Sequence, residues 1–467
     1  MTGLSAPGFP ERAVRARARG GAGAVFPPLE DYGTTVFGQA WAAGAVDAAA
    51  NGGDLIDESR LVPPVFMPQR LEKLIDLGRE PLHGDVDLRT RIGGFDSALP
   101  LCLSAFGSTT IASTDLGLAA GRQAARLGIP MVIGENIVPM NGYRGVGVPA
   151  GGDGPDEAES ASPLSGGFGR GAGNGLLERI LGYAECARDG LGGVIVQQSA
   201  DDADAEVWNL VYSDPRVQPL LESGRLGFEL KVGQGAKPGL GGMTVLGPAA
   251  AAGASAQYSV EPVFGESGGR FLRCGSPGTF TAEILSRQIQ LMRNNFPRAR
   301  VWVKLHPGRD VAFAAATAWR AGADAVAVDG AEGGSGWAPT AFLDQVGLPL
   351  ADCLLDLRAA GPRPPAATLL VSGRVWEGGR VAKCLALGAT AASLGRAALI
   401  AVDEDPEHGL IRLAAALELE LRLLISALGK YRAADLDGQD VRLPRRAGGG
   451  PADPAVDADA WAAGLAA

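Results

Sequence analysis

Cysteine and histidine are scarce in this sequence, with five and three among 467 residues. The cysteines stand at positions 102, 186, 274, 353 and 384, and no two share the short spacing of zinc or iron–sulfur ligands. The sequence therefore predicts no metal centre and no iron–sulfur cluster. Isolated cysteines are also typical of a reducing compartment, so we expect a cytoplasmic location.

Long apolar runs and an excess of basic residues are also missing. The apolar stretch Ala397–Val402 is far shorter than the roughly 20 residues that a membrane helix needs. Residues 1–28 carry several arginines and lack the continuous apolar core of a secretory signal. Acidic residues outnumber basic ones by 52 to 42, a net charge of −10. We therefore expect neither a membrane role, nor secretion, nor nucleic-acid binding.

The composition that is present is that of a folded protein. Hydrophobic residues make up 46% of the chain and charged residues 20%, which is enough apolar material for a sizeable core. At this length, two or three average domains or one elaborated barrel would both fit. The order of the segments along the chain has to decide between them.

From Ala98 onward, short apolar runs alternate with longer amphipathic stretches, which is the pattern of repeated βα units. Eight strands are predicted, the number in a (β/α)8 barrel, at 99–105, 130–134, 193–197, 227–232, 300–305, 325–328, 368–371 and 391–394. Helices are predicted between them, for example at 116–127, 282–295, 311–321, 341–346 and 378–387, with a long outer helix at 410–429.

The predicted fold class is therefore α/β, a (β/α)8 TIM barrel over residues 96–445. Residues 1–95 are interpreted as an N-terminal extension and residues 446–467 as a flexible tail. The segments 146–175 and 238–278 are too long for ordinary loops and follow strands on the face where barrels build their sites. Each is expected to cover or shape a site, and disordered filler is an equal alternative for the Gly-rich first segment.

The most informative segment is ELKVGQGAKPG at residues 229–239. It begins as a strand and leaves that strand through closely spaced glycines. A cation at Lys231, pointing inward at a strand end, is costly unless it meets an anion or an electron-rich ring. The segment therefore predicts a binding site at the carboxyl end of this strand.

A second feature follows the last two predicted strands. Gly373 and Gly395 allow backbone amides to approach a phosphate closely, and each is followed by an arginine, Arg374 or Arg396, that can add charge-assisted hydrogen bonds. These two turns predict a phosphate-binding site.

Segment 229–239 resembles the corresponding part of the FMN-binding synthase domain of glutamate synthase. Other segments resemble the same family in the same order, namely 104–107, 134–136, 280–283, 298–305, 328–336, 371–374 and 394–396. The resemblance spans about Ala98 to Asp437. It implies an FMN-binding barrel.

The resemblance also implies where FMN would lie. The isoalloxazine ring would cover the mouth of the barrel, with Gln197 bonded to its pyrimidine edge and Lys231 beside N1 and O2. One edge of the ring would rest on Ser104, Ala105, Phe106 and Gly107. The other implied cofactor contacts are Gly334, Ser372, Gly373, Arg374, Gly395 and Arg396.

A substrate cavity lined by Lys304, Lys237 and Glu332 is implied in the same way. The two lysines would hold an acidic group of the substrate, and Glu332 or Glu135 would move a proton. Simpler roles stay open: Lys304 as a surface lysine, Glu135 as a satisfied buried carboxylate and Glu332 as a solvated loop acid. His306 is interpreted as an ordinary loop residue rather than a proton donor.

Three departures from the family bear on function. Residues 397–437 contain no cysteine, so the iron–sulfur cluster that follows the last strand in glutamate synthase cannot form there. The family's N-terminal glutaminase needs a catalytic cysteine, but the first cysteine here, Cys102, lies in a predicted barrel strand. Ammonia would therefore have to come from a glutaminase or another partner. The family's Gly-Glu-Gly-Gly and His-Asp are Gly-Leu-Gly-Gly at 239–242 and Ala-Glu at 331–332, which indicates a different substrate.

We therefore expect an FMN-dependent oxidoreductase that acts on a carbon–nitrogen bond of a small metabolite, by reductive amination, imine reduction or amine oxidation. Electrons would come from an external reductase, a nicotinamide or the substrate. One alternative is an FMN-dependent oxidase or dehydrogenase of a hydroxy acid, and another is a non-catalytic barrel subunit of an amidotransferase assembly. The last helix and the N-terminal extension could mediate a homo-oligomer.

Overall fold

The computed structural model describes residues 4–38, 54–65, 80–107, 115–135, 137–138, 142–144, 175–199, 206–233, 243–248, 251–252, 255, 259–265, 269–274, 280–333 and 338–444. Within these ranges, eight parallel strands close into a barrel in the order β11-β12-β13-β14-β4-β5-β6-β7. Their bounds are β4 Leu101–Phe106, β5 Met131–Ile133, β6 Val194–Gln198, β7 Leu226–Val232, β11 Arg300–Leu305, β12 Ala325–Asp329, β13 Thr368–Ser372 and β14 Ala391–Leu394. The predicted (β/α)8 fold is confirmed, and each strand lies within about two residues of its predicted place.

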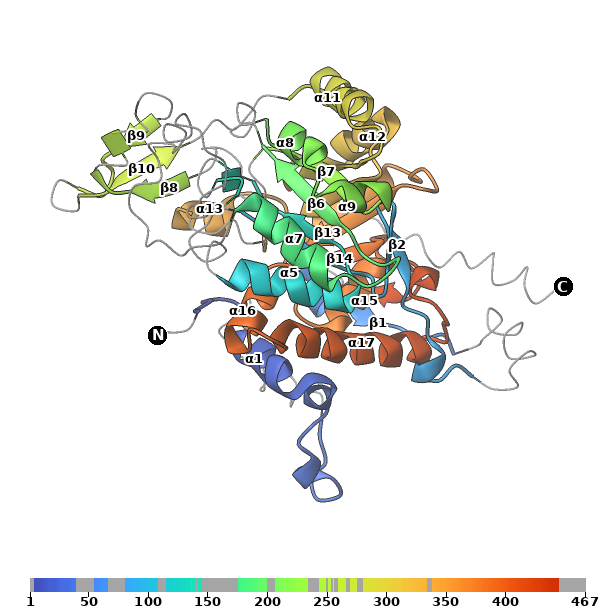
Figure 1. Cartoon of the computed structure of the whole chain (residues 1–467). Helices are drawn as coiled ribbons and strands as arrows, with labels where there is room; N and C mark the ends of the chain where they lie inside the picture. Colours follow the sequence, from blue (N-terminus) through green and yellow to red (C-terminus); the bar gives the residue numbers. More distant parts are fainter. Residues whose placement is uncertain are drawn as a thin grey trace.

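One or more helices follow each barrel strand, and most of them cover its outer face (Figure 1). The exception is Thr340–Gln345, which buries none of its residues. In chain order they are α5 (Asp115–Leu127), α7 (Leu176–Cys186), α8 (Val207–Ser213), α9 (Gln218–Glu222), α11 (Ala282–Asn295), α12 (Val311–Ala321), α13 (Thr340–Gln345), α14 (Leu350–Ala359), α15 (Gly378–Ala386), α16 (Arg396–Glu404) and α17 (Gly409–Ala427). In the part of the chain that the structure describes, no helix is long and apolar enough to cross a membrane.

Local sequence explains where these helices begin and what they bury. The N-cap Thr281 of α11 accepts a hydrogen bond from the Ile284 backbone at 3.1 Å. The buried residues of α11 are Leu285, Ile289 and Met292, four and three positions apart, so one stripe of the helix faces the barrel. Helix α12 ends at Gly322, whose φ of 105° lies in the left-handed region that glycine adopts easily.

The inside of the barrel has its own apolar core below the polar residues of the mouth. Its members are Ile92, Phe95, Cys102, Val132, Ile195, Trp302, Ala325, Leu370 and Ala391. Because side chains alternate along a strand, their neighbours point outward to the helices. The barrel is therefore filled with side chains at its lower end and is not a pore.

A short hairpin closes the amino end of the barrel. It consists of β2 (Thr90–Ile92) and β3 (Phe95–Ser97), joined by two glycines with positive φ. The Trp302 indole nitrogen donates to the Gly93 carbonyl at 3.0 Å, and the Gly93 amide donates to the Thr368 hydroxyl at 2.8 Å. The hairpin thus fixes the base of β11 and β13.

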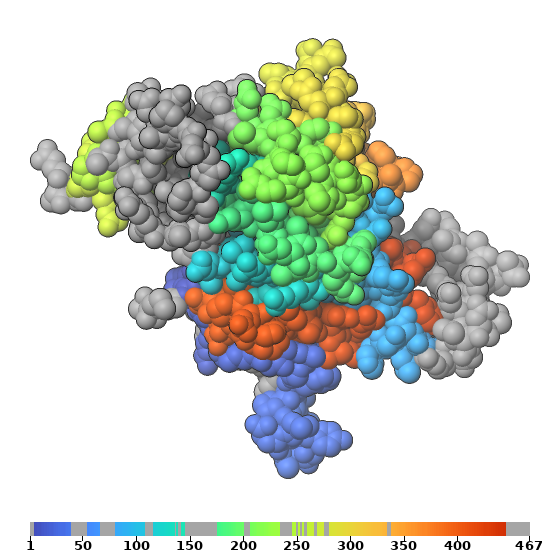
Figure 2. Space-filling view, viewed as in Figure 1, coloured from blue at the N-terminus to red at the C-terminus, as the bar shows by residue number. Residues whose placement is uncertain are grey.

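Most of the described N-terminal residues pack on the same barrel, whereas the segment around Leu29–Asp31 projects from it, with Leu29 84% exposed (Figure 2). The N-terminal elements are α1 (Glu11–Gly20), η1 (Gly21–Val25), η2 (Leu29–Asp31), α3 (Leu55–Glu58), β1 (Arg60–Leu61) and η5 (His83–Asp85). Helix α1 lies along α16 and α17 (Figure 1), and α3 lies against α15. Strand β1 pairs with β15 (Val441–Arg442), which follows η10 (Ala433–Asp435) near the other end of the chain.

The long segment between β7 and α11 contains a small antiparallel sheet. Its strands are β8 (Met243–Leu246), β9 (Ser259–Glu261) and β10 (Phe271–Cys274), with β10 in the middle. In Figure 2 this yellow-green sheet lies at one edge of the molecule, away from the helices that surround the barrel. The sequence predicts only an extended loop for this segment.

Candidate functional site

The turn after β13 has a distinctive backbone. Gly373 has a φ of 152°, and Arg374 has a φ of 54°, in the left-handed region that residues other than glycine rarely adopt. On the neighbouring strand, Gly395 is the N-cap of α16 and has no side chain that could bond the first N–H groups of the helix. A left-handed turn beside a helix N-terminus is an arrangement suited to an anion.

Arg396, the first residue of α16, reaches from β14 towards β12. Its guanidinium donates to the backbone carbonyl of Glu332, in the loop after β12. Because β13 lies between β12 and β14, the side chain has to cross the end of β13, where Gly373 and Arg374 lie. Burial, together with the charge of Arg374, lowers the pKa of Arg396. The two arginines expected at a phosphate are therefore neighbours.

Two acidic residues of the N-terminal segment meet this corner of the barrel. Arg380 of α15 is fully buried and donates to Gly373 O at 2.8 Å, to Asp54 at 2.5 Å and to Asp57 at 2.6 Å. The Nε of Arg374 lies 3.5 Å from Asp57 Oδ2. Arg380 thus connects α3 to the turn after β13, a connection that local sequence patterns do not predict.

A row of polar side chains crosses the mouth of the barrel. The strand register places Gln197 beside Glu229, Lys231 beside Lys304, and Asp329 beside Ser372. Each pair shares one level because parallel neighbours in register point their side chains the same way. The row lies directly above the apolar core of the barrel interior.

The first contact in this row joins Gln197 and Glu229. The Gln197 amide donates to the Glu229 carboxylate at 2.6 Å, and Glu229 is only 1% exposed. Burial raises the pKa of Glu229, against the opposing effect of Lys304. The bond fixes the direction of the Gln197 amide, one of the expected cofactor contacts.

The second contact joins Lys304 and Asp329, whose charged atoms lie 2.8 Å apart. Burial opposes the charge of Lys304, but the carboxylates of Asp329 and Glu229 raise its pKa above the ordinary value. Asp329 also accepts from the Ser372 hydroxyl. Lys304 is therefore a charged group inside the barrel, and the surface position considered from sequence is wrong.

Lys231 pairs with Glu135, which follows β5. Both side chains are largely buried, at 12% and 14% exposed, much like those of Lys304 and Asp329 at 10%. The Glu135 Oε2 atom is buried and makes no hydrogen bond within the described residues. One carboxylate oxygen of Glu135 therefore bonds to Lys231, and the other has no hydrogen-bond partner among the described residues.

The end of β4 carries Ser104, Ala105, Phe106 and Gly107 beside the end of β5. The Gly134 amide donates to Phe106 O at 2.9 Å, and a Cβ on Gly134 would lie 2.7 Å from the Gly107 Cα. The two strand ends can approach this closely only because both residues are glycine.

Arg179 of α7 holds the same strand end from outside. It donates to Phe106 O at 3.1 Å and to Gly107 O at 3.4 Å. Burial lowers the pKa of Arg179 to about 10. Sequence reasoning missed this residue because an arginine on an amphipathic helix usually faces solvent.

Glu332 lies on the other side of the loop after β12, away from the polar row. Its carboxyl group accepts from the Leu350 amide at 3.0 Å and lies 3.8 Å from Arg380. Burial and the neighbouring Asp54 raise the pKa of Glu332 to about 8. In the described residues no contact joins Glu332 to Lys304, so the structure does not bring these two expected catalytic residues together.

Two of the expected site residues, Lys237 and Gly334, lie outside the described residues. The residues of the row that sequence reasoning did not assign are Glu229 and Asp329. Glu229 had a signal, since it stands two positions before Lys231 on a strand and must point to the same side. Asp329 had a similar signal as the acid that ends an apolar strand.

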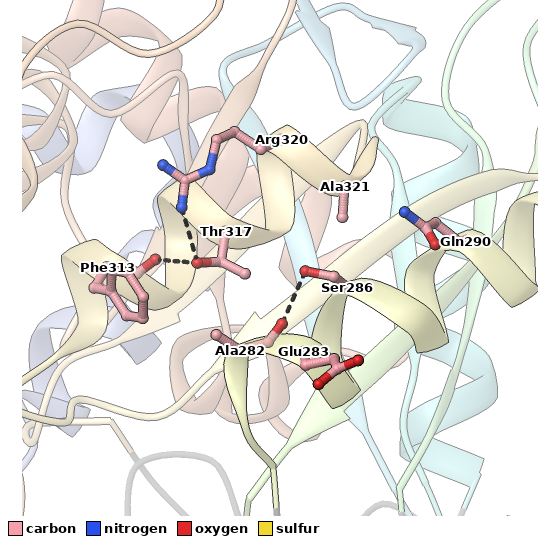
Figure 3. Close-up of a pocket in the computed structure, with 8 residues that line it drawn as sticks. All are labelled: Ala282, Glu283, Ser286, Gln290, Phe313, Thr317, Arg320 and Ala321. Carbon is pink, nitrogen blue, oxygen red and sulfur yellow. Dashed lines mark hydrogen bonds between the residues drawn. The ribbon is translucent and has the colours of Figure 1, made fainter.

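Two pockets lie outside the barrel, between α11 and α12. The first, of about 340 Å³, is an open groove in which Ser286 and Thr317 bond back to their own helices (Figure 3). The second, of about 290 Å³, is reached from the ends of β7 and β11 and includes His306. His306 Nδ1 lies 3.3 Å from Val232 O. Neither pocket includes a residue of the polar row.

Comparison with known proteins identifies a conserved segment of this barrel. Residues 218–404 match the family described as "Conserved region in glutamate synthase". The chain is 36% identical over 187 residues to an archaeal-type glutamate synthase (NADPH) of Dehalococcoides mccartyi, covering 39% of this chain and 36% of that protein. It is 33% identical over 185 residues to a glutamate synthase large subunit-like protein of Rhizobium meliloti, covering 39% and 40%. The match thus spans well under half the length of either relative.

Solved structures agree on the fold. A chimera of (S)-mandelate dehydrogenase superposes with a TM-score of 0.50 over 93% of this chain and 99% of that chain, at 15% identity. A mandelate oxidase with 2-hydroxy-phenylacetamide has a TM-score of 0.50 over 93% and 98%, at 16% identity. At this identity the likeness concerns the fold alone. The sequence match is the more specific finding, and it shows that residues 218–404 of this barrel are similar to the conserved region of glutamate synthases.

Proposed function

We propose that this protein is an FMN-dependent oxidoreductase that acts on a carbon–nitrogen bond of a small metabolite. The observation that carries the proposal is the position of two different features at one end of one barrel. The turns at Gly373 and Gly395 are suited to a phosphate, and the row that contains Lys231 and Lys304 is suited to a polar ring and a polar substrate. The similarity to glutamate synthases supports the same assignment.

The residues present fit FMN at the phosphate end. Arg396 and Arg374 lie next to each other, and burial of Arg396 strengthens its interaction with an anion. At the ring end, Gly107 and Gly134 follow β4 and β5 and carry no side chains, so a flat ring could rest directly on the backbone there. Lys231 would face the edge of that ring and favour negative charge there.

When bound, FMN would supply two-electron transfer, which none of the side chains in the polar row supplies. Gln197, held by Glu229, would orient the ring through its amide. Lys304 would keep its proton, because two carboxylates surround it, and would donate a hydrogen bond to a polar group of the substrate. Glu135 would hold or release a proton at its unoccupied Oε2 atom. Glu332 is the weaker candidate for that role because its contacts lie outside the row.

Electrons for the reaction would come from a separate donor, either a reductase or a nicotinamide. The similar archaeal-type glutamate synthase of Dehalococcoides mccartyi is named as an NADPH enzyme, and it is considerably longer than the segment matched here. The proposal also includes a separate partner protein, such as a glutaminase, that would supply ammonia.

The test is an anaerobic reaction of the FMN-loaded, photoreduced protein with 2-oxo acids and ammonium, followed by absorbance at about 450 nm. We expect the absorbance to return faster with a 2-oxo acid and ammonium together than with either alone, and the product to be an amino acid. The Lys304→Met variant should lose most of this acceleration. Reduction of the oxidised protein by 2-hydroxy acids, with rapid peroxide formation in air, would instead establish the hydroxy-acid alternative.

A further inference from the structure

The N-terminal segment touches the phosphate end of the candidate site through an aromatic ring. Phe9 is 5% exposed, and its ring centroid lies 4.9 Å from the central carbon of the Arg396 guanidinium. Backbone bonds fix the neighbouring residues, since the Phe9 amide donates to Ala6 O at 3.1 Å and the Leu4 amide donates to Asp403 at 3.0 Å. The ring is therefore held in place against Arg396.

Arg396 differs from the other arginines of this corner in its partners. Arg380 and Arg374 lie against the carboxylates of Asp54 and Asp57. In the part of the chain that the structure describes, no carboxylate pairs with Arg396, although the residue is buried and lies near Arg374. Its hydrogen-bond acceptor among the described residues is a backbone carbonyl, which does not neutralise its positive charge.

A buried, uncompensated guanidinium beside a second one is unfavourable unless an anion completes the group. An acidic neighbour would hold Arg396 equally well but would cancel the charge that a phosphate needs. The face of an aromatic ring attracts a guanidinium without neutralising it. Phe9 can therefore orient the Arg396 side chain without neutralising the Arg396 charge.

We propose that Phe9 is a positioning residue that holds Arg396 ready for the phosphate of the cofactor, so that the N-terminal segment is part of the binding site. This inference rests on the proposed function, because it takes FMN as the ligand. It concerns the phosphate alone and predicts no contact between Phe9 and the ring of the flavin.

The experiment compares the dissociation constants of FMN and riboflavin, which differ by the phosphate, for the full chain and its Phe9→Leu variant. Leucine keeps the apolar contact and removes the aromatic face. We expect the variant to bind FMN about threefold to tenfold more weakly and riboflavin within twofold of the unaltered protein. The Phe9→Tyr variant, which keeps the ring, should restore the FMN affinity.

A matched control separates positioning from general destabilisation. Val14 is fully buried on α1 in the same N-terminal segment, and Val14→Ala removes packing without touching Arg396. It should lower the melting temperature and leave the ratio of the two dissociation constants unchanged.

The outcomes distinguish the two proposals. Equal losses for FMN and riboflavin in Phe9→Leu, or an unchanged FMN affinity, would overturn the role of Phe9 while leaving FMN binding intact. If the unaltered protein binds neither compound, the proposed function fails first, and the positioning role fails with it.

Discussion

The ammonium group of Lys304 lies 2.8 Å from the carboxylate of Asp329, where the neighbouring strands β11 and β12 end inside the barrel. Lys304 is 8% exposed and Asp329 7% exposed, so both charges have left bulk water. Each depends on the other for compensation. A substrate would therefore contact the Lys304–Asp329 ion pair and not an isolated lysine.

Replacing Lys304 by methionine should therefore destabilise the fold. Asp329 would remain buried with only the Ser372 hydroxyl as its donor in the row, and breaking a buried pair from one side typically costs about 3–5 kcal/mol. Urea denaturation measures the free energy of unfolding. The double variant Lys304→Met, Asp329→Asn should recover much of the loss, and equal stability of the single and double variants would contradict the pairing.

Glu332 should make stability depend on pH. Its pKa is raised to about 8 by burial and by Asp54, while Arg380 opposes the rise, so the folded protein holds a proton that the unfolded chain releases near its ordinary value of 4.5. The stabilisation from this proton is complete below about pH 4.5 and is lost as the pH rises towards 8.

The measurement for Glu332 compares the unaltered protein with Glu332→Gln, which stays neutral throughout. Between pH 5 and 8 the unaltered protein should lose at least about 1 kcal/mol of unfolding free energy relative to the variant. Glu418→Gln, on a more exposed face of α17, provides the baseline. A constant difference across this range would show that Glu332 does not carry the proton.

The hairpin at the base of the barrel should tolerate no side chain at Gly93. Its φ is 53°, and a Cβ there would overlap the indole of the fully buried Trp302. Overpacking and backbone strain together predict a loss of at least about 2 kcal/mol for Gly93→Ala. Gly84→Ala is the matched control, since a Cβ at Gly84 meets nothing within 4 Å. Equal midpoints of thermal unfolding for the two variants would contradict the close packing of this hairpin against Trp302.

Arg380 should be the main anchor of α3. Its side chain is fully buried between Asp54 and Asp57, so Arg380→Met would leave two carboxylates without their shared cation and cost about 3–5 kcal/mol. Arg19 also pairs with an acid, Glu404, but is 59% exposed, and Arg19→Met should cost less than about 1 kcal/mol. Similar unfolding midpoints for the two variants would be inconsistent with this anchoring.

The sequence predicts the barrel well because its signals are local. Each strand is a short apolar run next to an amphipathic helix, and the strand around Lys304 has the bounds expected from sequence, 300–305. The hairpin at the amino end of the barrel was not predicted, although its Gly93-Gly94 turn is a recognisable signal. Its strands have only three residues each, which is too few to show a clear alternation of apolar and polar residues. The small sheet within 243–274 was not predicted because its strands, of three or four residues, are also too short to carry a clear pattern.

The candidate site was predicted in part. Residues at strand ends, such as Lys231 and Gly373, follow from their position along the chain. The contacts of Phe9 with Arg396 and of Asp54 with Arg380 join residues more than 300 positions apart, and no local pattern specifies them. The same holds for Glu332, whose neighbours come from three separate segments.

The most direct test of the account is the absorbance spectrum of the purified protein, followed by denaturation and identification of any released chromophore. We expect bands near about 370 and 450 nm, one FMN released per chain, and lower occupancy in Lys231→Ala and Arg396→Ala. A colourless protein that takes up no FMN on incubation would contradict the central claim that the mouth of this barrel is a flavin site.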